Sequence, residues 1–259
     1  MPQDPSPSET AGIPPAFANA YADEARADAY AGLEFPGTYY LAFRDVPAIL
    51  AAHVTGTAAL DFGCGAGRST RFLRGLGFDV VGVDIADEML RRARRSDPQG
   101  EYLRVADDDL GTLGSRRFDL VFSAFTFDNV PTRAKKVTLF RALGALLRPA
   151  GRIVNLVSSP DIYLHEWASF STKDFPENRR AEAGDVVRIV MLDVPDRRPV
   201  EDVLWPDAAY RDVYVQAGLD IVDTHRPLGR PTDPHRWVSE TTVAPWSIYV
   251  LRPARASGG

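Results

Sequence analysis

The sequence has few cysteines, few lysines and no long apolar runs, and each shortage excludes a class of protein. Cys64 is the only cysteine among 259 residues, which excludes an internal disulfide and a cysteine-rich metal site. Lysine occurs only at positions 135, 136 and 173, and arginine supplies the rest of the 30 basic residues. The formal net charge is −5, so no broad basic field is present to hold nucleic acid.

Neither the apolar runs nor the N-terminus indicates a membrane or an export route. No apolar stretch approaches the roughly 20 residues that a membrane-spanning helix needs. Residues 1–10 contain neither the basic segment nor the apolar segment of a secretion signal. They are rich in Pro and Ser, and we expect disordered tails over residues 1–15 and 255–259. We therefore expect a cytoplasmic protein that binds neither membrane nor nucleic acid.

Strand-like and helix-like segments alternate over much of the chain. Strands are predicted at 58–62, 79–83, 101–105, 118–124 and 152–157, and helices at 68–76, 86–95 and 132–147. Two further strand-like segments, 219–224 and 243–251, flank a Pro-rich loop near the C-terminus. Strands separated by helical crossovers predict an α/β fold with a parallel, doubly wound sheet.

The first predicted strand leads into the segment around which the chain is organised. Residues 58–70 indicate a buried strand, a glycine turn and the start of a helix, with Gly63, Gly65 and Gly67 at alternate positions. Because glycine lacks a Cβ, the main chain there can pass close to a ligand, and the following helix directs its unpaired N–H groups to the same place. A dinucleotide fingerprint requires glycine at position 68, where this chain has Arg68. A glycine turn that only permits close packing of strand and helix is the alternative.

With Asp61 two positions before the first glycine, this segment resembles the first motif of the class I S-adenosylmethionine-dependent methyltransferases. Within that family the chain is most similar to the small-molecule enzymes of the ubiquinone/menaquinone-biosynthesis type. The resemblance implies S-adenosyl-L-methionine as cofactor and S-adenosyl-L-homocysteine as product. It also implies a Rossmann-like, seven-stranded sheet, mostly parallel with the last strand antiparallel. It covers roughly residues 56–157, so it does not identify the methyl acceptor.

Residues at the ends of the predicted strands are expected to complete the cofactor site. A carboxylate at Asp84 can accept hydrogen bonds from both ribose hydroxyls of an adenosine, although it can also cap the helix that follows. The resemblance implies an acidic residue that pairs with adenine after the third strand, where three consecutive aspartates leave the register open. The expected cofactor-binding residues are Asp61, Gly63, Cys64, Gly65, Gly67, Asp84, Ile85, Met89, Asp107, Asp108, Asp109, Ser123, Ala124 and Phe125.

The remaining segments are expected to surround the substrate within a single domain over residues 16–254. N-terminal helices over 16–52 would form a lid, and the insert over 158–205 would form a cap. The expected substrate-binding residues are Tyr21, Tyr30, Tyr39, Phe127, Asn129 and Trp167. Core packing is the alternative for each aromatic residue, and capping of the next helix is the alternative for Asn129.

Two residues are candidates for a catalytic base. His165 lies in the insert beside an acidic and an aromatic residue, and a histidine that only holds the insert to the core is the alternative. Asp128 is the second candidate. Asp161 and His165 have the spacing of a metal pair on a helix, but no third ligand lies in obvious reach, so we expect no metal site.

The sequence therefore predicts an enzyme that moves a methyl group to N, O or C of a small-molecule metabolite by in-line displacement. The preference for arginine over lysine suggests a bacterial source, and we expect a role in secondary metabolism. An adenosylmethionine-binding protein with a non-methylating role is the alternative, while Arg68 disfavours a nicotinamide-dependent oxidoreductase. Both a monomer and a homodimer are compatible with the sequence.

Overall fold

The computed structural model describes residues 35–106 and 109–255. The predictions for Tyr21, Tyr30, Asp107 and Asp108 fall outside these residues, as do those for the first tail and the earlier part of the lid. Among the helices that are described, none combines the length and the apolar character that a membrane span needs.

Seven strands of the described residues form the main sheet, in the order β3-β2-β1-β4-β5-β10-β9. Their bounds are β1 (Ala58–Phe62), β2 (Asp79–Asp84), β3 (Glu101–Arg104), β4 (Phe118–Ala124), β5 (Leu147–Ser158), β9 (Leu219–His225) and β10 (Trp246–Pro253). The first five are parallel, and β10 runs antiparallel to both β5 and β9. The predicted seven-stranded sheet with an antiparallel last strand is therefore confirmed.

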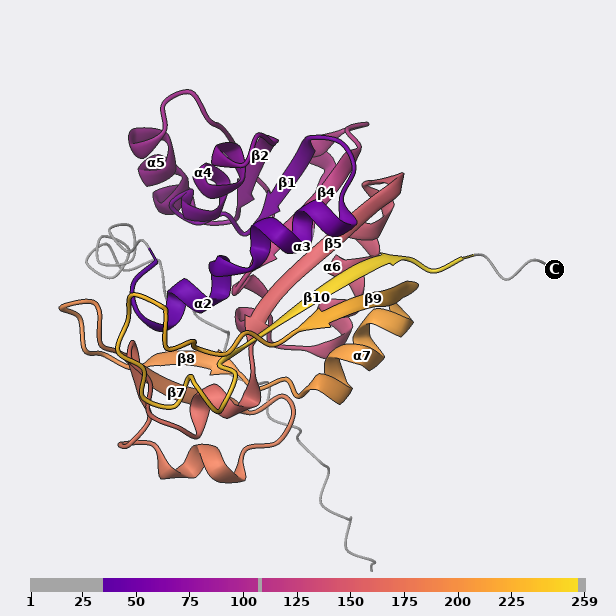
Figure 1. Ribbon diagram of the computed structural model, residues 1–259. Coiled ribbons are helices and arrows are strands. Elements are labelled where there is room, and N and C mark those ends of the chain that lie inside the picture. Colours follow the sequence, from indigo (N-terminus) through magenta and orange to yellow (C-terminus); the bar gives the residue numbers. More distant parts are fainter. Residues whose placement is uncertain (1–34, 107–108, 256–259) are drawn as a thin grey trace, which may run out of the picture.

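Helices cover both faces of this sheet (Figure 1). They are α2 (Thr38–Arg44), α3 (Val46–His53), α4 (Arg68–Gly75), α5 (Asp87–Ser96), α6 (Arg133–Ala145) and α7 (Asp207–Gln216). Side chains alternate along β1, so Ala59 belongs to the apolar cluster with α2, α3 and α4, while Leu60 belongs to the cluster with α6 and α7. The sheet is thus the middle of three layers.

The described part of the expected N-terminal lid forms two short helices, α2 and α3, which meet at Asp45. Pro47 lies in the first turn of α3, where its missing N–H leaves no hydrogen bond unmade. In a continuous helix the Pro47 ring would meet the carbonyl of Phe43, so one helix must end before a second begins. The two short helices still bury their apolar sides, with Leu41 and Val46 both fully buried.

The insert after β5 forms a small antiparallel sheet of its own. It contains η4 (Pro160–Tyr163), β6 (Phe170–Ser171), η5 (Pro176–Arg180), β7 (Val186–Met191) and β8 (Val200–Val203). Phe170 and Met191 from this sheet pack in the same apolar cluster as Tyr39 of α2. Strand β8 also contacts the short helix η3 (Thr126–Asn129) that follows β4. The insert therefore lies against the carboxyl end of β4 and against α2 (Figure 1).

Candidate functional site

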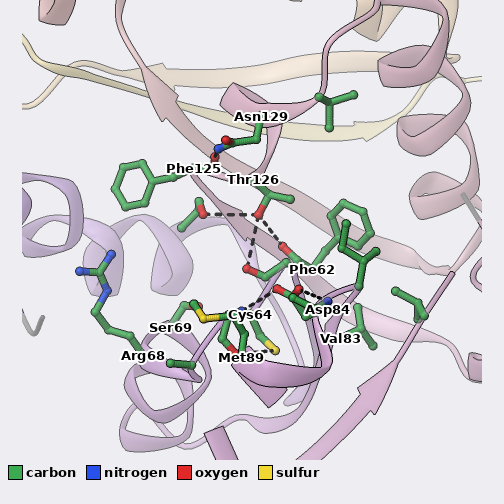
Figure 2. Close-up of a pocket in the computed structure, with 18 of the residues that line it drawn as sticks. Phe62, Cys64, Arg68, Ser69, Val83, Asp84, Met89, Phe125, Thr126 and Asn129 are labelled. Carbon is green, nitrogen blue, oxygen red and sulfur yellow. Dashed lines mark hydrogen bonds between the residues drawn. The ribbon is translucent and has the colours of Figure 1, made fainter. Parts of the chain in front are cut away.

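A cavity of about 540 Å³ lies at the carboxyl ends of β1, β2 and β4. Its volume is within the range of small-molecule sites, and its position is where open α/β sheets bind ligands. Figure 2 shows Arg68 and Phe125 toward one side of this cavity and Asp84 and Val83 toward the other. The lining residues are Phe43, Phe62, Gly63, Cys64, Gly65, Ala66, Arg68, Ser69, Val83, Asp84, Ile85, Ala86, Met89, Val105, Ala124, Phe125, Thr126, Asn129, Val130, Pro131, Lys135 and Leu139.

The glycine turn between β1 and α4 has the left-handed main-chain conformation that glycine tolerates. The φ angles of Gly63 and Gly67 are 74° and 82°. A Cβ at Gly63 would lie 2.1 Å from the hydroxyl oxygen of Thr126, which itself donates a 3.0 Å hydrogen bond to the Phe62 carbonyl. The turn is therefore held against η3, and its bare main chain forms one wall of the cavity.

Asp84 joins the end of β2 to the glycine turn. One carboxylate oxygen accepts a 2.8 Å hydrogen bond from the N–H of Gly65, and the other accepts a 2.8 Å bond from the N–H of Ala86. Burial raises the pKa of Asp84, while the main-chain donors at Ala86, Gly65 and Ile85 oppose that shift. A carboxylate has about four acceptor sites, so these three donors leave room for a hydrogen bond from a ligand.

Asp61 is fully buried behind the cavity rather than among its lining residues. Its Oδ2 accepts 2.6 Å hydrogen bonds from the hydroxyls of Ser69 and Thr70 in the first turn of α4. Burial raises the pKa of Asp61 to about 6, although the two hydrogen bonds lower it. Asp61 therefore orients the helix whose N-terminus adjoins the cavity.

Cys64, Ile85 and Met89 line the cavity, as the sequence predicts. Burial raises the pKa of the Cys64 thiol well above its usual value, with the charges of Asp61 and Asp84 acting in the same direction. A thiol with a raised pKa is a poor nucleophile. Cys64 therefore supplies an apolar surface here, and Ile85, whose side chain is exposed, supplies another.

Arg68, at the start of α4, directs its guanidinium group into a group of aromatic rings. The guanidinium carbon lies 5.0 Å from the ring centre of Tyr39 and 5.6, 5.7 and 5.9 Å from those of Phe35, Phe43 and Phe125. Aromatic faces stabilise a cation at such distances. A permanently charged group is therefore held at one side of the cavity, where it can bind a carboxylate.

The residues after β4 form the boundary between two cavities. Phe125 is the one non-glycine residue with a positive φ in the described part of the chain, at 63°. Asn129 donates a 3.3 Å hydrogen bond from its side chain to the Phe125 carbonyl. Both residues line the first cavity and also a second, smaller one of about 30 Å³ between η3 and the insert.

The second cavity combines aromatic rings with carboxylates. Its described lining residues are Tyr39, Phe125, Asp128, Asn129, Ser158, Ile162, Tyr163, Phe170, Ile189, Met191, Val200, Asp202 and Trp246. The hydroxyl of Tyr163 donates a 3.0 Å hydrogen bond to Asp202, and the N–H of Ser158 donates a 3.1 Å bond to Asp128. The cavity is thus apolar and aromatic on most sides, with two carboxylates on one side.

Lys136 of α6 is fully buried next to these carboxylates. Its ammonium group donates to the Phe127 carbonyl and lies 5.1 Å from the ring centre of Trp205. Burial lowers the pKa of Lys136, and the charges of Asp128 and Asp202 oppose this. Burial raises the pKa of Asp128, and the hydrogen bonds from Ser158 and the charge of Lys136 oppose this. Two carboxylates therefore face one ammonium group in a buried cluster.

Seven predicted site residues line neither cavity in the described part of the chain: Asp61, Gly67, Asp109, Ser123, Phe127, Trp167 and His165. Phe127 and Trp167 are buried in the core: Phe127 stacks on Phe140 at 3.9 Å, and the Trp167 indole donates a 2.7 Å hydrogen bond to the Ile162 carbonyl. Ser123 is fully buried within β4. Asp109 is exposed and accepts a hydrogen bond from the N–H of Gly111. These residues therefore lie away from the cavity walls, and their binding roles stay predictions.

His165, the first candidate for a catalytic base, lines neither cavity. Its ring lies edge-on to Trp167 with 5.9 Å between ring centres, and its carbonyl accepts a 2.9 Å hydrogen bond from Thr172. Both contacts of His165 are with other residues of the insert, and its catalytic role stays a prediction. Asp128, the second candidate, does line the smaller cavity.

Some lining residues were missed by the sequence-based prediction. Thr126, Val105 and Phe43 line the first cavity, and Tyr163 and Asp202 line the second. Thr126 follows a predicted strand directly, so its position at a carboxyl strand end was a usable signal. Asp202 lies in the insert, where no motif indicates which side chains turn toward the sheet.

Comparisons with known proteins agree with this geometry. Residues 60–155 match the family described as methyltransferase domain. The ubiquinone biosynthesis O-methyltransferase of Bordetella avium is 33% identical over 106 residues, which cover 39% of this chain and 43% of that protein. The enzyme of the same name from Cereibacter sphaeroides is 29% identical over 166 residues, covering 55% and 63%. The chain thus spans less than two thirds of the length of these relatives.

A solved structure extends the likeness to most of the chain at the level of the fold. The CcbJ methyltransferase from Streptomyces caelestis superposes with a TM-score of 0.60 and 20% identity, covering 86% of this chain and 100% of that one. Residues 60–155 thus match a methyltransferase domain, and the fold over most of the chain is similar to that of a solved methyltransferase. S-adenosyl-L-methionine is the cofactor of such domains.

The first cavity fits that cofactor. The turn at Gly63–Gly67 leaves main chain bare where side chains would fill the wall, and a Cβ at Gly65 would come within 3.3 Å of Met89. Asp84 has lone pairs available for hydroxyl groups, and Arg68 places a cation on the other side of the cavity. Ile85, Met89 and Val105 form an apolar wall of the same cavity, and such a wall suits the flat adenine ring of the cofactor.

Proposed function

We propose that the chain is an enzyme that transfers a methyl group from S-adenosylmethionine to a nitrogen atom of a small molecule. The observation that carries the proposal is the first cavity, in which a bare glycine turn, the carboxylate of Asp84 and the guanidinium of Arg68 surround about 540 Å³. A second cavity of about 30 Å³ shares Phe125 and Asn129 with the first; it has room for an amine group only, so the body of the acceptor would lie in the first cavity beside the cofactor.

Each group of lining residues has a role in this proposal. Asp84 accepts hydrogen bonds from the ribose hydroxyls, while Arg68 pairs with the carboxylate of the methionine moiety. Ile85, Met89 and Val105 pack against the adenine ring. When bound, the cofactor supplies a methyl group that is activated by a positively charged sulfur. Asp61 acts through α4 as a positioning residue, since its hydrogen bonds go to Ser69 and Thr70.

The lining of the second cavity supports an amine as the acceptor. Two carboxylates, Asp128 and Asp202, outnumber the one buried ammonium group of Lys136, so a cationic ligand is favoured there. The rings of Tyr39, Phe125 and Trp246 also suit a cation.

A protonated amine must lose a proton before its nitrogen can accept a methyl group. In the proposal this proton goes to a carboxylate oxygen of Asp128, whose pKa is raised by burial and therefore closer to the working pH. The freed nitrogen lone pair forms the new bond to the methyl carbon as the bond between that carbon and sulfur breaks. Asn129 and Phe125 hold the acceptor in line with the methyl group.

Calorimetry and label transfer test this function. We expect the purified chain to bind S-adenosylmethionine and S-adenosylhomocysteine in the micromolar range and not to bind NAD. With methyl-tritiated cofactor and a bacterial metabolite extract, we expect a labelled product that is retained by a cation exchanger. Tight binding of NAD alone would reject the methyltransferase proposal. Binding without any labelled product would favour a non-methylating role, and a labelled neutral product would reject the amine.

Bacterial secondary metabolism, a cytoplasmic location and a monomeric or homodimeric state remain predictions from the sequence. The arginine-rich composition and the bacterial source of the relatives and of the solved neighbour support a bacterial origin, but not a particular kind of metabolism.

A further inference from the structure

A cluster of two histidines and an aspartate lies away from both cavities, where α3 meets the edge of the main sheet. His53 is the last residue of α3, and Asp223 and His225 lie on β9, the edge strand. Residues two apart on a strand point to the same face, so both β9 side chains can meet His53. The three side chains are 19%, 41% and 33% exposed, respectively.

The donor atoms of this cluster converge on one point. The Nε2 atoms of His53 and His225 each lie 3.1 Å from Oδ2 of Asp223, and one ligand atom from each residue lies within 4.8 Å of the others. A tetrahedral zinc ion with bonds of about 2.0–2.1 Å separates its ligand atoms by about 3.3 Å. The observed spacing is therefore close to that of a filled site.

Hydrogen bonding alone leaves one atom of the cluster unexplained. The Nε2 atom of His53 and Oδ2 of Asp223 are 3.1 Å apart and form a hydrogen bond. The Nε2 atom of His225, in contrast, is shielded from solvent and forms no hydrogen bond with any described residue, despite its 3.1 Å distance from Asp223. A buried polar atom without a hydrogen-bond partner destabilises the fold. A metal ion would supply such a partner, because the lone pair of the His225 Nε2 atom can coordinate it.

We propose that His53, Asp223 and His225 bind a divalent transition-metal ion of the zinc class. Two imidazole nitrogens and a carboxylate oxygen suit zinc, and the partial exposure of the cluster leaves a fourth position for water. None of the three is among the described residues that line a cavity, so the ion has a structural role. It links α3 to β9 across 170 positions of sequence. Helix α3 follows α2, which carries Tyr39 and Phe43 to the two cavities.

A metal titration of the tag-free, metal-free full-length chain tests the proposal. With Co²⁺ as the probe we expect one ion per chain and the visible absorption of a tetrahedral site, displaced by Zn²⁺. Zn²⁺ should also raise the melting temperature. Loss of a second-sphere partner weakens metal sites about 10- to 100-fold, so loss of a ligand in His53→Ala or His225→Ala should weaken binding at least about 100-fold.

His165→Ala is the matched control, since it removes a half-buried histidine outside the cluster. It should leave the titration unchanged. Failure of the parent chain to bind Co²⁺ would overturn the proposal, and so would equal binding by the parent chain and both ligand variants. Because the readouts are absorption and melting temperature, the result is independent of the proposed methyl transfer.

Discussion

The N–H of Gly65 donates a 2.8 Å hydrogen bond to the carboxylate of Asp84. This bond joins the turn after β1 to the end of β2, so the two parts of the chain that the sequence singles out lie side by side. The same carboxylate also holds the N–H of Ala86 at the start of α5. Asp84 therefore shapes the wall of the first cavity and still offers lone pairs to a ligand.

Replacement of Asp84 by asparagine should weaken cofactor binding. In the amide, an NH₂ group replaces one of the two oxygens that accept the N–H groups of Gly65 and Ala86, and this group cannot accept a hydrogen bond. The amide also lacks the negative charge that strengthens these bonds. Hydrogen bonds to charged groups contribute about 1.5–3 kcal/mol each, so we expect affinity for S-adenosylhomocysteine to fall about 10- to 100-fold by calorimetry. Asp109→Asn, at an exposed carboxylate outside the cavity, is the control and should bind normally.

Replacement of Gly63 by alanine should destabilise the fold. The new Cβ would lie 2.1 Å from the Thr126 hydroxyl at a φ of 74°, so a steric clash adds to the strain of a left-handed conformation. We expect the free energy of unfolding to fall by about 2–4 kcal/mol in urea denaturation. Gly77→Ala is matched in φ, at 92°, but has no heavy atom within 4 Å of its Cβ. It should cost only about 1–2 kcal/mol, and equal losses would contradict the clash.

Replacement of Arg68 by alanine should weaken the binding of ligands that carry the methionine carboxylate and spare the binding of ligands that lack it. If the guanidinium binds the methionine carboxylate, the variant should bind S-adenosylhomocysteine about 10-fold or more weakly. Its affinity for 5′-methylthioadenosine, which lacks that carboxylate, should change little. Calorimetry with both ligands measures the difference, and a parallel loss of both affinities would show that Arg68 instead supports the aromatic residues Tyr39 and Phe125.

The main sheet and the cofactor side of the site follow from local sequence signals. Glycines at alternate positions determine the main-chain conformation of the turn at 63–67, and the end of a strand determines the position of Asp84. Both features are local in the sequence, so both are predictable. The seven strands follow from apolar segments that alternate with helical ones. Even here Asp61 is misplaced, because the sequence does not reveal that its carboxylate turns to α4 rather than to the cavity.

The acceptor side depends on contacts between distant segments, which no local pattern specifies. The sequence predicts that Trp167 binds substrate and that His165 acts as a base, yet Trp167 is buried and His165 packs against it. Lys136 has the sequence context of a surface residue on an amphipathic helix but is fully buried beside Asp128. His53 and His225 converge only because α3 lies over the edge strand β9. Tertiary packing decides each of these positions.

Asp128 and His165 should differ in their effect on turnover. Asp128→Asn removes the proposed proton acceptor, and general bases typically contribute about 10²- to 10⁴-fold, so kcat should fall by that order while affinity for S-adenosylhomocysteine is retained. His165→Ala should change kcat by less than about twofold, because its ring packs on Trp167 outside both cavities. Measurement of kcat with the labelled cofactor checks both variants. A large loss in the His165 variant alone would restore the histidine as the base.

The stability of the protein should depend on pH through Asp61. Its pKa is about 6 in the folded chain, above the ordinary value of 3.8 that an unfolded chain would show, so the folded state holds the proton more tightly. The contribution of this group to stability is therefore fully present below about pH 4 and is lost as pH rises through about 6. A shift of about two units corresponds to about 3 kcal/mol.

Asp61→Asn isolates this contribution from those of other carboxylates. The amide oxygen can still accept the hydroxyls of Ser69 and Thr70, and the amide nitrogen replaces Oδ1, which has no hydrogen-bond partner among the described residues. Urea denaturation at pH 4, 5, 6 and 7 should show a flatter pH dependence in this variant than in the parent chain. Glu177→Gln, at an exposed carboxylate, controls for the lost charge. If Asp61→Asn and the parent chain give parallel curves, Asp61 is ionised in the folded protein at pH 5, and burial does not raise its pKa.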